Sequence, residues 1–166
     1  MTVHRRGRAA LRVLCVDDDE LVLNGTVRML ADFDVVRVAD PCTALERLCH
    51  SDDIDVVVSD VMMPEMTGPE LYVACSRHSP VLASRFIFAS GDLYAARTLL
   101  DAAVERVRAV DAPMLIAKPL SQDTLLAAVA GVVERVGVAQ RSPFPQSGTY
   151  RVARASSWPE LGESGS

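Results

Sequence analysis

Cysteine and histidine are scarce in this chain of 166 residues, and their spacing excludes the common zinc-binding patterns. The four cysteines are Cys15, Cys42, Cys49 and Cys75, and none belongs to a Cys-x-x-Cys pair. No histidine lies at a spacing that would complete a zinc site with them. We therefore expect free, buried thiols, as in a protein of a reducing cytoplasm.

Long apolar runs and an excess of positive charge are also missing. No run approaches the roughly 18 apolar residues of a membrane-spanning helix, so we expect no membrane insertion. The net charge is −5 and the pI is about 5.1, which argues against direct nucleic-acid binding. The basic residues Arg5, Arg6 and Arg8 precede an apolar run that breaks at Asp17, which does not fit a signal peptide. We expect a cytoplasmic protein.

Hydrophobic periodicity predicts an alternation of strands and helices. Short valine-rich runs are typical of strands that are buried on both faces of a parallel sheet. In the segment 20–31, Leu23, Val27 and Leu30 lie on one helical face, and Asp40 followed by Pro41 is a typical helix start. The predicted strands are 11–16, 34–38, 54–59, 85–89 and 114–117, and the predicted helices are 20–31, 41–50, 69–77, 93–108 and 122–136. Five such units predict an α/β fold with helices on both faces of a parallel sheet.

The chain divides into one domain and two terminal segments. Residues 1–10 form a basic arm that we expect to be flexible, and residues 11–136 form the domain. Residues 137–166 are rich in Ser, Gly, Pro and Arg without any period, so we expect a disordered tail. Trp158 is its conspicuous apolar residue, with a docking element as the alternative to a loose tail residue. No internal repeat is present.

Two of the predicted strands end at aspartate. Residues 11–16 run into Asp17 and Asp18, and residues 54–59 run into Asp60. Ligands of open α/β sheets bind in the crevice at the carboxyl ends of the strands. If the two strands are neighbours, the three carboxylates converge, and a hard divalent cation relieves their repulsion. Mg²⁺ is the expected cation, because it takes one or two carboxylates and commonly binds phosphate as well.

A hydroxyl and an ammonium group follow two further strands, at Ser90 and Lys118. A metal ion and a lysine can neutralise the oxygens of a phosphoryl group, and a hydroxyl can donate to a third oxygen. One carboxylate is then available as a nucleophile that forms an acyl phosphate. The loop after Asp60 contains Pro64 and Gly68, which we expect to let the chain bend closely around a bound ion.

Four motifs together resemble the receiver domain of bacterial response regulators. They are Val-Asp-Asp-Asp at 16–19, Ser-Asp-Val-Met-Met-Pro-Glu-Met-Thr-Gly at 59–68, Ala-Ser-Gly at 89–91 and Lys-Pro at 118–119. The resemblance covers residues 10 to about 136, and all four motifs occur in order at predicted strand ends. It implies a flavodoxin-like fold with strand order 2-1-3-4-5.

The resemblance also implies residue roles. Asp60 would accept a phosphoryl group from a sensor histidine kinase or a histidine phosphotransfer protein. Lys118 would pair first with Asp60 and then with the phosphoryl oxygens, and Ser90 would move to bond the new phosphate. No catalysis is expected beyond acceptance and slow autodephosphorylation.

The metal ligands are implied in the same way. Asp18 and Asp60 would bind Mg²⁺ directly, Asp17 would assist, and the backbone carbonyl of Met62 would supply another ligand. Asp19 fits a helix N-cap better than a metal ligand.

The sequence departs from the family pattern at two points. Leu115 stands three residues before the lysine, where receivers that drive output domains usually carry Tyr or Phe. The interval between Ser90 and Lys118 is also longer than usual, and the extra residues lengthen the helix or the loop after it. Both traits resemble receivers that work with hybrid sensor kinases. We hypothesise that the chain passes on or absorbs phosphoryl groups and does not act through a DNA-binding partner.

Two other functions remain open from the sequence. A degenerate receiver would act only as a protein-interaction surface. A phosphatase of the haloacid dehalogenase type would use Asp17 as nucleophile and Asp19 as the second carboxylate, but it needs further acidic ligands after Lys118, where only Asp123 follows closely.

Overall fold

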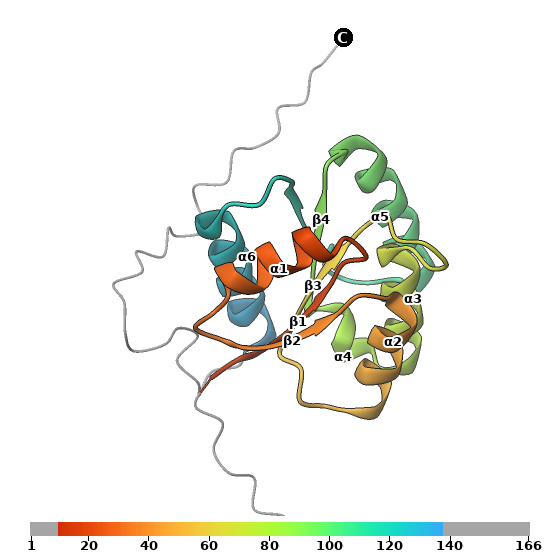
Figure 1. Ribbon diagram of the computed structural model, residues 1–166. Coiled ribbons are helices and arrows are strands. Elements are labelled where there is room, and N and C mark those ends of the chain that lie inside the picture. Colours follow the sequence, from red (N-terminus) through yellow and green to blue (C-terminus); the bar gives the residue numbers. More distant parts are fainter. Residues whose placement is uncertain (1–9, 138–166) are drawn as a thin grey trace, which may run out of the picture.

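Five parallel strands form one sheet in the computed structural model, which describes residues 10–137 (Figure 1). The strands are β1 (Arg12–Val16), β2 (Asp34–Val38), β3 (Val56–Asp60), β4 (Phe86–Ser90) and β5 (Met114–Ala117). Their order is β2-β1-β3-β4-β5, and every neighbouring pair is parallel. The predicted α/β fold with strand order 2-1-3-4-5 is confirmed.

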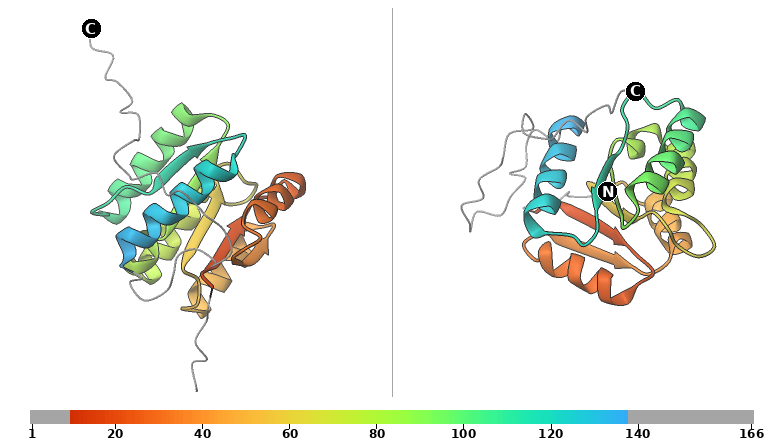
Figure 2. Two further views of the ribbon diagram at one scale, coloured as in Figure 1. Left: turned by 90° about the vertical axis from the view of Figure 1, so that its left-hand side faces the viewer. Right: turned by 90° about the horizontal axis from the view of Figure 1, so that it is seen from above.

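Helices cover both faces of this sheet. In chain order they are α1 (Glu20–Met29), α2 (Pro41–His50), α3 (Gly68–His78), α4 (Pro80–Ala83), α5 (Leu93–Val107) and α6 (Gln122–Val136). Helices α1 and α6 lie on one face, and α2 to α5 lie on the other (Figures 1 and 2). Parallel strands joined by helical crossovers require this coverage, because each face of the sheet is apolar.

The strands divide the hydrophobic core into two clusters. Val13 and Cys15 of β1 face the cluster formed with α1 and α6, whereas Leu14 and Val16 face the cluster formed with α2, α3 and α5. Successive side chains of a strand point to opposite faces, so a strand buried on both sides shows a continuous apolar run. This explains why the valine-rich runs stand out in the sequence.

Side-chain caps begin five of the helices directly after the loops that leave the strands. In each case, the cap oxygen accepts a backbone N–H of the first turn, which is worth about 0.5–2 kcal/mol per cap. Asp19, Asp40 and Ser121 cap α1, α2 and α6 as predicted, and Thr67 and Asp92 cap α3 and α5. The caps therefore fix the position at which each loop ends and the next helix begins.

Several predicted boundaries were wrong by one or two residues. Strands β3 and β4 run one residue further than predicted and so include Asp60 and Ser90, and helix α3 already begins at Gly68. The single turn α4 was missed. The extra residues after Ser90 lie in the 15-residue α5 and in the loop before β5. Helix α5 is capped at its C-terminus by Arg108, which has a left-handed conformation.

Burial of the cysteines was only partly predicted correctly. All four thiols are free, but Cys42 is exposed and Cys49 is half-buried. Cys15 and Cys75 are buried, and burial raises the pKa of each thiol to about 12.

The predicted arm and tail lie outside the described residues, apart from Ala10 and Gly137 at their borders. Within residues 10–137, no helix is long and apolar enough to span a bilayer.

Candidate functional site

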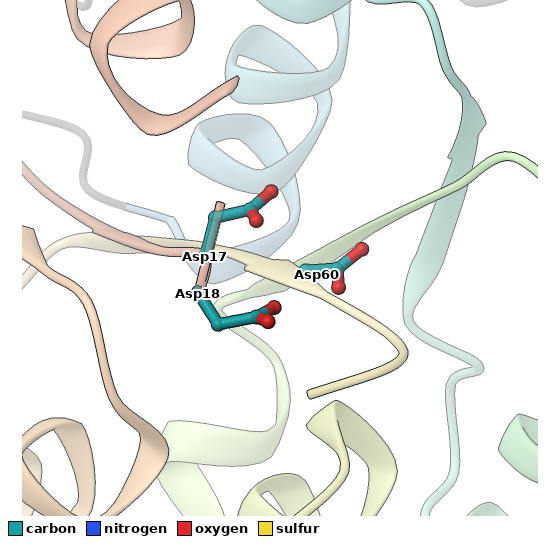
Figure 3. A group of neighbouring side chains, drawn as sticks. All are labelled: Asp17, Asp18 and Asp60. Carbon is teal, nitrogen blue, oxygen red and sulfur yellow. The ribbon is translucent and has the colours of Figure 1, made fainter. Parts of the chain in front are cut away.

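The three predicted carboxylates converge at the carboxyl edge of the sheet. Strands β1 and β3 are neighbours with Val16 paired to Ser59, so Asp17, Asp18 and Asp60 leave the sheet side by side (Figure 3). One carboxylate oxygen from each lies within 4.8 Å of the others. Asp17 is buried, Asp60 is partly buried and Asp18 is exposed, so the cluster opens towards solvent on the side of Asp18.

Lys118 closes the buried side of this cluster. Its Nζ donates hydrogen bonds to Asp60 Oδ1 at 2.7 Å and to Asp17 Oδ2 at 2.8 Å. Burial alone would lower the pKa of Lys118, but the two carboxylates outweigh burial and raise it. The ammonium group is therefore held charged between two acids. The pairing with Asp60 was predicted from the resemblance, whereas the contact with Asp17 was not.

Asp60 is electrostatically distinct because burial raises the pKa of its carboxyl group above the ordinary value, and the nearby Asp17 adds to the rise. The hydrogen bond and the charge of Lys118 act in the opposite direction without cancelling the effect. A carboxylate whose charge is penalised by its surroundings gains from any further positive charge nearby. The site therefore favours binding of a cation.

Ser90 ends β4 beside this group, with Ala89 paired to Asp60 across the two strands. Its Oγ donates to the backbone carbonyl of Asp92 and accepts from the backbone N–H of Asp92, both at 3.1 Å. In the described part of the chain, its hydroxyl has no hydrogen bond to Asp60 or Lys118. The serine lies at the predicted edge, and its hydroxyl is engaged in a local turn.

Gly68 controls the approach of the loop after β3 to Asp60. A Cβ atom at this position would lie 2.2 Å from the backbone oxygen of Asp60 and 3.0 Å from Cε1 of Phe88. Its backbone N–H also donates to the carbonyl of Val61 at 2.9 Å. The predicted reason, backbone freedom, was wrong, because Gly68 has an ordinary helical conformation at the start of α3. The glycine is needed because the two backbone segments touch.

The same loop carries Met62, which is 61% exposed. Met63, by contrast, is buried in the core. The role of the Met62 carbonyl as a ligand stays a prediction.

Thr67 and Asp92 were missed as caps beside the site, although the Thr-x-x-Glu spacing of 67–70 is the signature of a capping box.

The donor set suits a hard divalent cation. Three carboxylates and one ammonium group leave a net negative charge on the cluster, and every available ligand atom is an oxygen. Oxygen ligands of this kind favour Mg²⁺ over softer metals. The predicted magnesium site therefore fits the residues present.

Asp19, by contrast, is committed to the helix. Its Oδ1 accepts hydrogen bonds from the backbone N–H groups of Leu21 and Val22 at 2.9 and 3.3 Å. A phosphatase of the haloacid dehalogenase type would need this carboxylate as its second acid. The cap therefore removes one of the observations that favoured that alternative.

The chain has a parallel sheet in the order β2-β1-β3-β4-β5. Acids lie at the carboxyl ends of β1 and β3, a hydroxyl at that of β4 and a lysine after β5. This combination defines the class of receiver domains. The sequence model of the response regulator receiver domain family matches residues 13–130. The chain belongs to this family, whose members are the receivers of two-component signalling.

Individual relatives agree with this assignment. The sensor kinase CckA of Brucella abortus (strain 2308) is 40% identical over 82 residues, which cover 48% of this chain but only 8% of that protein. The chemotaxis protein CheY4 of Vibrio cholerae is 26% identical, with a TM-score of 0.62 over 75% of this chain and 99% of that one. The signal receiver domain of an HD domain-containing protein from Pseudomonas fluorescens Pf-5 shares the fold at 23% identity, with a TM-score of 0.65 over 76% and 97% of the two chains.

Proposed function

We propose that this chain is a working phosphoacceptor, in which Asp60 receives a phosphoryl group from a phosphohistidine of a partner protein. The observation that carries the proposal is the Asp60 carboxylate, which is partly buried, lies next to two further acids and accepts a 2.7 Å hydrogen bond from Lys118. A receiver that acted only as an interaction surface would have no need to keep this charge arrangement together.

The proposed transfer is a simple displacement at phosphorus. A carboxylate oxygen of Asp60 forms the new P–O bond while the P–N bond to the partner's imidazole breaks, and the leaving nitrogen takes up a proton. Little covalent assistance is needed, so catalysis rests on positioning and on neutralising charge. Lys118 already spans Asp60 and Asp17, and its ammonium group can pass from the carboxylate to an oxygen of the bound phosphoryl group.

Asp17, Asp18 and Asp60, together with the carbonyl of Met62, would hold Mg²⁺ at this site. When bound, the ion would supply positive charge for the carboxylates and for the incoming phosphoryl oxygens. The exposed position of Asp18 leaves that side of the cluster open to solvent.

Ser90 is the proposed switch residue. Its hydroxyl now bonds the backbone of Asp92 at the start of α5. A phosphoryl group on Asp60 would offer a charged acceptor, and charge-assisted hydrogen bonds are about twice as strong as neutral ones. Movement of Ser90 to this acceptor would release the turn at Asp92 and so change the start of α5. This is a local charge change that alters a surface.

The partner is proposed to be a sensor histidine kinase or a histidine phosphotransfer protein. The similarity to part of a sensor kinase supports this, as does Leu115, which is half-buried against the α2–α5 side of the core where an aromatic switch residue would stand. We propose that the chain relays or absorbs phosphoryl groups and has no further enzymatic activity. Tight, phosphorylation-dependent binding to a transcription factor would contradict this part.

Intact-mass spectrometry after incubation with acetyl phosphate and Mg²⁺ tests the proposal. We expect one added phosphate on the wild type and on Asp101→Asn, a matched change at an exposed aspartate of α5. We expect none on Asp60→Asn or in the presence of a chelator. If folded wild-type protein gains no phosphate either from acetyl phosphate or from histidine kinases, the interaction-only alternative is favoured.

A further inference from the structure

A groove lies at the amino-terminal edge of the sheet, away from Asp60. It opens between the single turn α4, which precedes β4, and the loop that links α5 to β5. Its volume is about 260 Å³, below the roughly 300–1,000 Å³ of cavities that hold drug-sized ligands, so it suits one or two side chains. Its lining includes Pro80, Ala83, Val107, Arg108, Val110 and Asp111.

Apolar side chains at this groove are unusually exposed. Val110 is 98% exposed although it is aliphatic, and Pro80 of α4 is also exposed. Together with the half-buried Ala83 and Val107, they form an apolar surface that stays open to solvent within residues 10–137. Covering it would remove apolar surface from water, which is favourable.

Positive charge borders the same groove. Arg135 of α6 donates from Nη1 to the carbonyl of Ala112 at 3.0 Å and from Nη2 to the carbonyl of Ser84 at 3.2 Å, and Ser84 lines the groove. The buried Nε of Arg135 has no hydrogen-bond partner. Within the described residues, neither Arg135 nor Arg108 forms an ion pair, and Asp111 is the acidic residue of the lining. An occupant with apolar and acidic groups would fit.

The chain itself contains such a segment. Residues 158–163 read Trp-Pro-Glu-Leu-Gly-Glu, and Glu160 and Glu163 are the only acidic residues after Gly137. The intervening residues 138–157 instead carry three arginines and no acid. Charge complementarity therefore selects residues 158–163 over the other aromatic residues of this stretch, at 144 and 150.

The attachment point of this segment lies next to the groove. Arg135, whose guanidinium reaches Ser84, is two residues before Gly137, where the described part of the chain ends. A random-coil segment of about 20 residues has a root-mean-square end-to-end distance of about 25 Å, which is enough for residue 158 to reach the groove. A linker of this length also gives an effective concentration of about 1 mM, so a contact that would be weak between separate molecules is populated here.

We propose that residues 158–163 dock in this groove of their own chain, with Trp158 against Val110 and Ala83 and with the two glutamates beside Arg108 and Arg135. An aromatic side chain such as Trp buries roughly 150–250 Å² and dominates contacts of this kind. The docked segment covers the exposed Val110 and supplies the carboxylates that the two arginines lack. The proposal does not depend on phosphorylation of Asp60.

Trp158 is the only tryptophan of the chain, so its fluorescence in the full-length protein reports the contact directly. We expect acrylamide to quench the wild type about twofold less than Val110→Asp, as a contact of about half occupancy at millimolar effective concentration predicts. Leu21→Asp, a matched change at an exposed residue of α1 near the opposite edge of the sheet, should behave like the wild type.

A second variant keeps the test independent of the folded core. The double change Glu160→Lys and Glu163→Lys lies outside the described domain and should raise quenching to the level of Val110→Asp. Equal quenching of the wild type and of both groove-directed variants would overturn the proposal. Protection that appears only as the protein concentration rises would also overturn it, because a second copy would then be the occupant.

Discussion

Gly68→Ala is expected to damage both the fold and the site, although alanine normally favours a helix. At an ordinary helical position, alanine is better than glycine by up to about 1 kcal/mol. At Gly68 the added Cβ would lie 2.2 Å from the Asp60 carbonyl oxygen and 3.0 Å from Phe88 Cε1. The first contact is with backbone, so relief requires α3 or β3 to shift.

Overpacking of this kind costs typically 1–3 kcal/mol, and a backbone partner places Gly68→Ala near the upper end. After subtracting the helix preference, we expect a loss of about 2 kcal/mol in the free energy of unfolding, measured by urea denaturation. Because the displaced group is Asp60 itself, phosphorylation by acetyl phosphate should also slow, by up to about 100-fold for a 1 Å shift.

Gly25→Ala provides the matched control. This glycine lies within α1, its conformation is not left-handed, and a Cβ there would meet nothing within 4 Å. The same substitution should therefore stabilise the protein by about 1 kcal/mol and leave phosphorylation unchanged. A Gly68→Ala protein as stable as the wild type would refute the close-approach argument, as would destabilisation of both variants to the same degree.

Three further predictions concern the metal site, the lysine and a helix cap. Mg²⁺ at ten times its dissociation constant should raise the free energy of unfolding by about 1.4 kcal/mol in the wild type, and by less in Asp18→Asn. A wild-type Tm that does not change on addition of Mg²⁺ would count against the site. Lys118→Ala should impair the phosphorylation-induced change in NMR chemical shifts near α5 more than it impairs phosphate uptake, and wild-type behaviour in both would show that the lysine was misassigned. Asp40→Ala should cost about 1 kcal/mol near neutral pH. The hydrogen bond from the Thr43 N–H lowers the pKa of Asp40 below its ordinary 3.8, so in urea titrations the part of this difference that depends on the charged carboxylate should be lost as pH falls through the lowered pKa. A difference that does not change at all with pH would exclude the charge of the carboxylate as a contributor.

Much of the fold was predictable because local signals agree with the tertiary structure. The boundaries of α2 and α6 were predicted correctly, since Asp40 and Ser121 cap them and apolar periodicity runs their full length. The one-turn helix α4 was missed because four residues are too short to show a period, and its N-cap Ser79 makes no side-chain cap hydrogen bond.

The site was predictable in composition and only in part in its contacts. Strand-end position places Asp17, Asp18, Asp60, Ser90 and Lys118 at one edge of the sheet, and the neighbouring strands β1 and β3 bring the acids together. No local pattern indicates that Lys118 bonds Asp17 as well as Asp60, or that Gly68 touches the Asp60 carbonyl. Such contacts depend on the packing of segments far apart in the sequence, which the motifs do not encode.

Chemical trapping of the acyl phosphate is the most direct test of the central claim. Borohydride reduces an aspartyl phosphate to homoserine, and tandem mass spectrometry of the digested protein then locates the changed residue. After incubation with acetyl phosphate and Mg²⁺, the account predicts homoserine at position 60 and at no other aspartate, and no homoserine when a chelator is present. Homoserine at another aspartate, or an unchanged Asp60 in protein that has gained a phosphate, would contradict it.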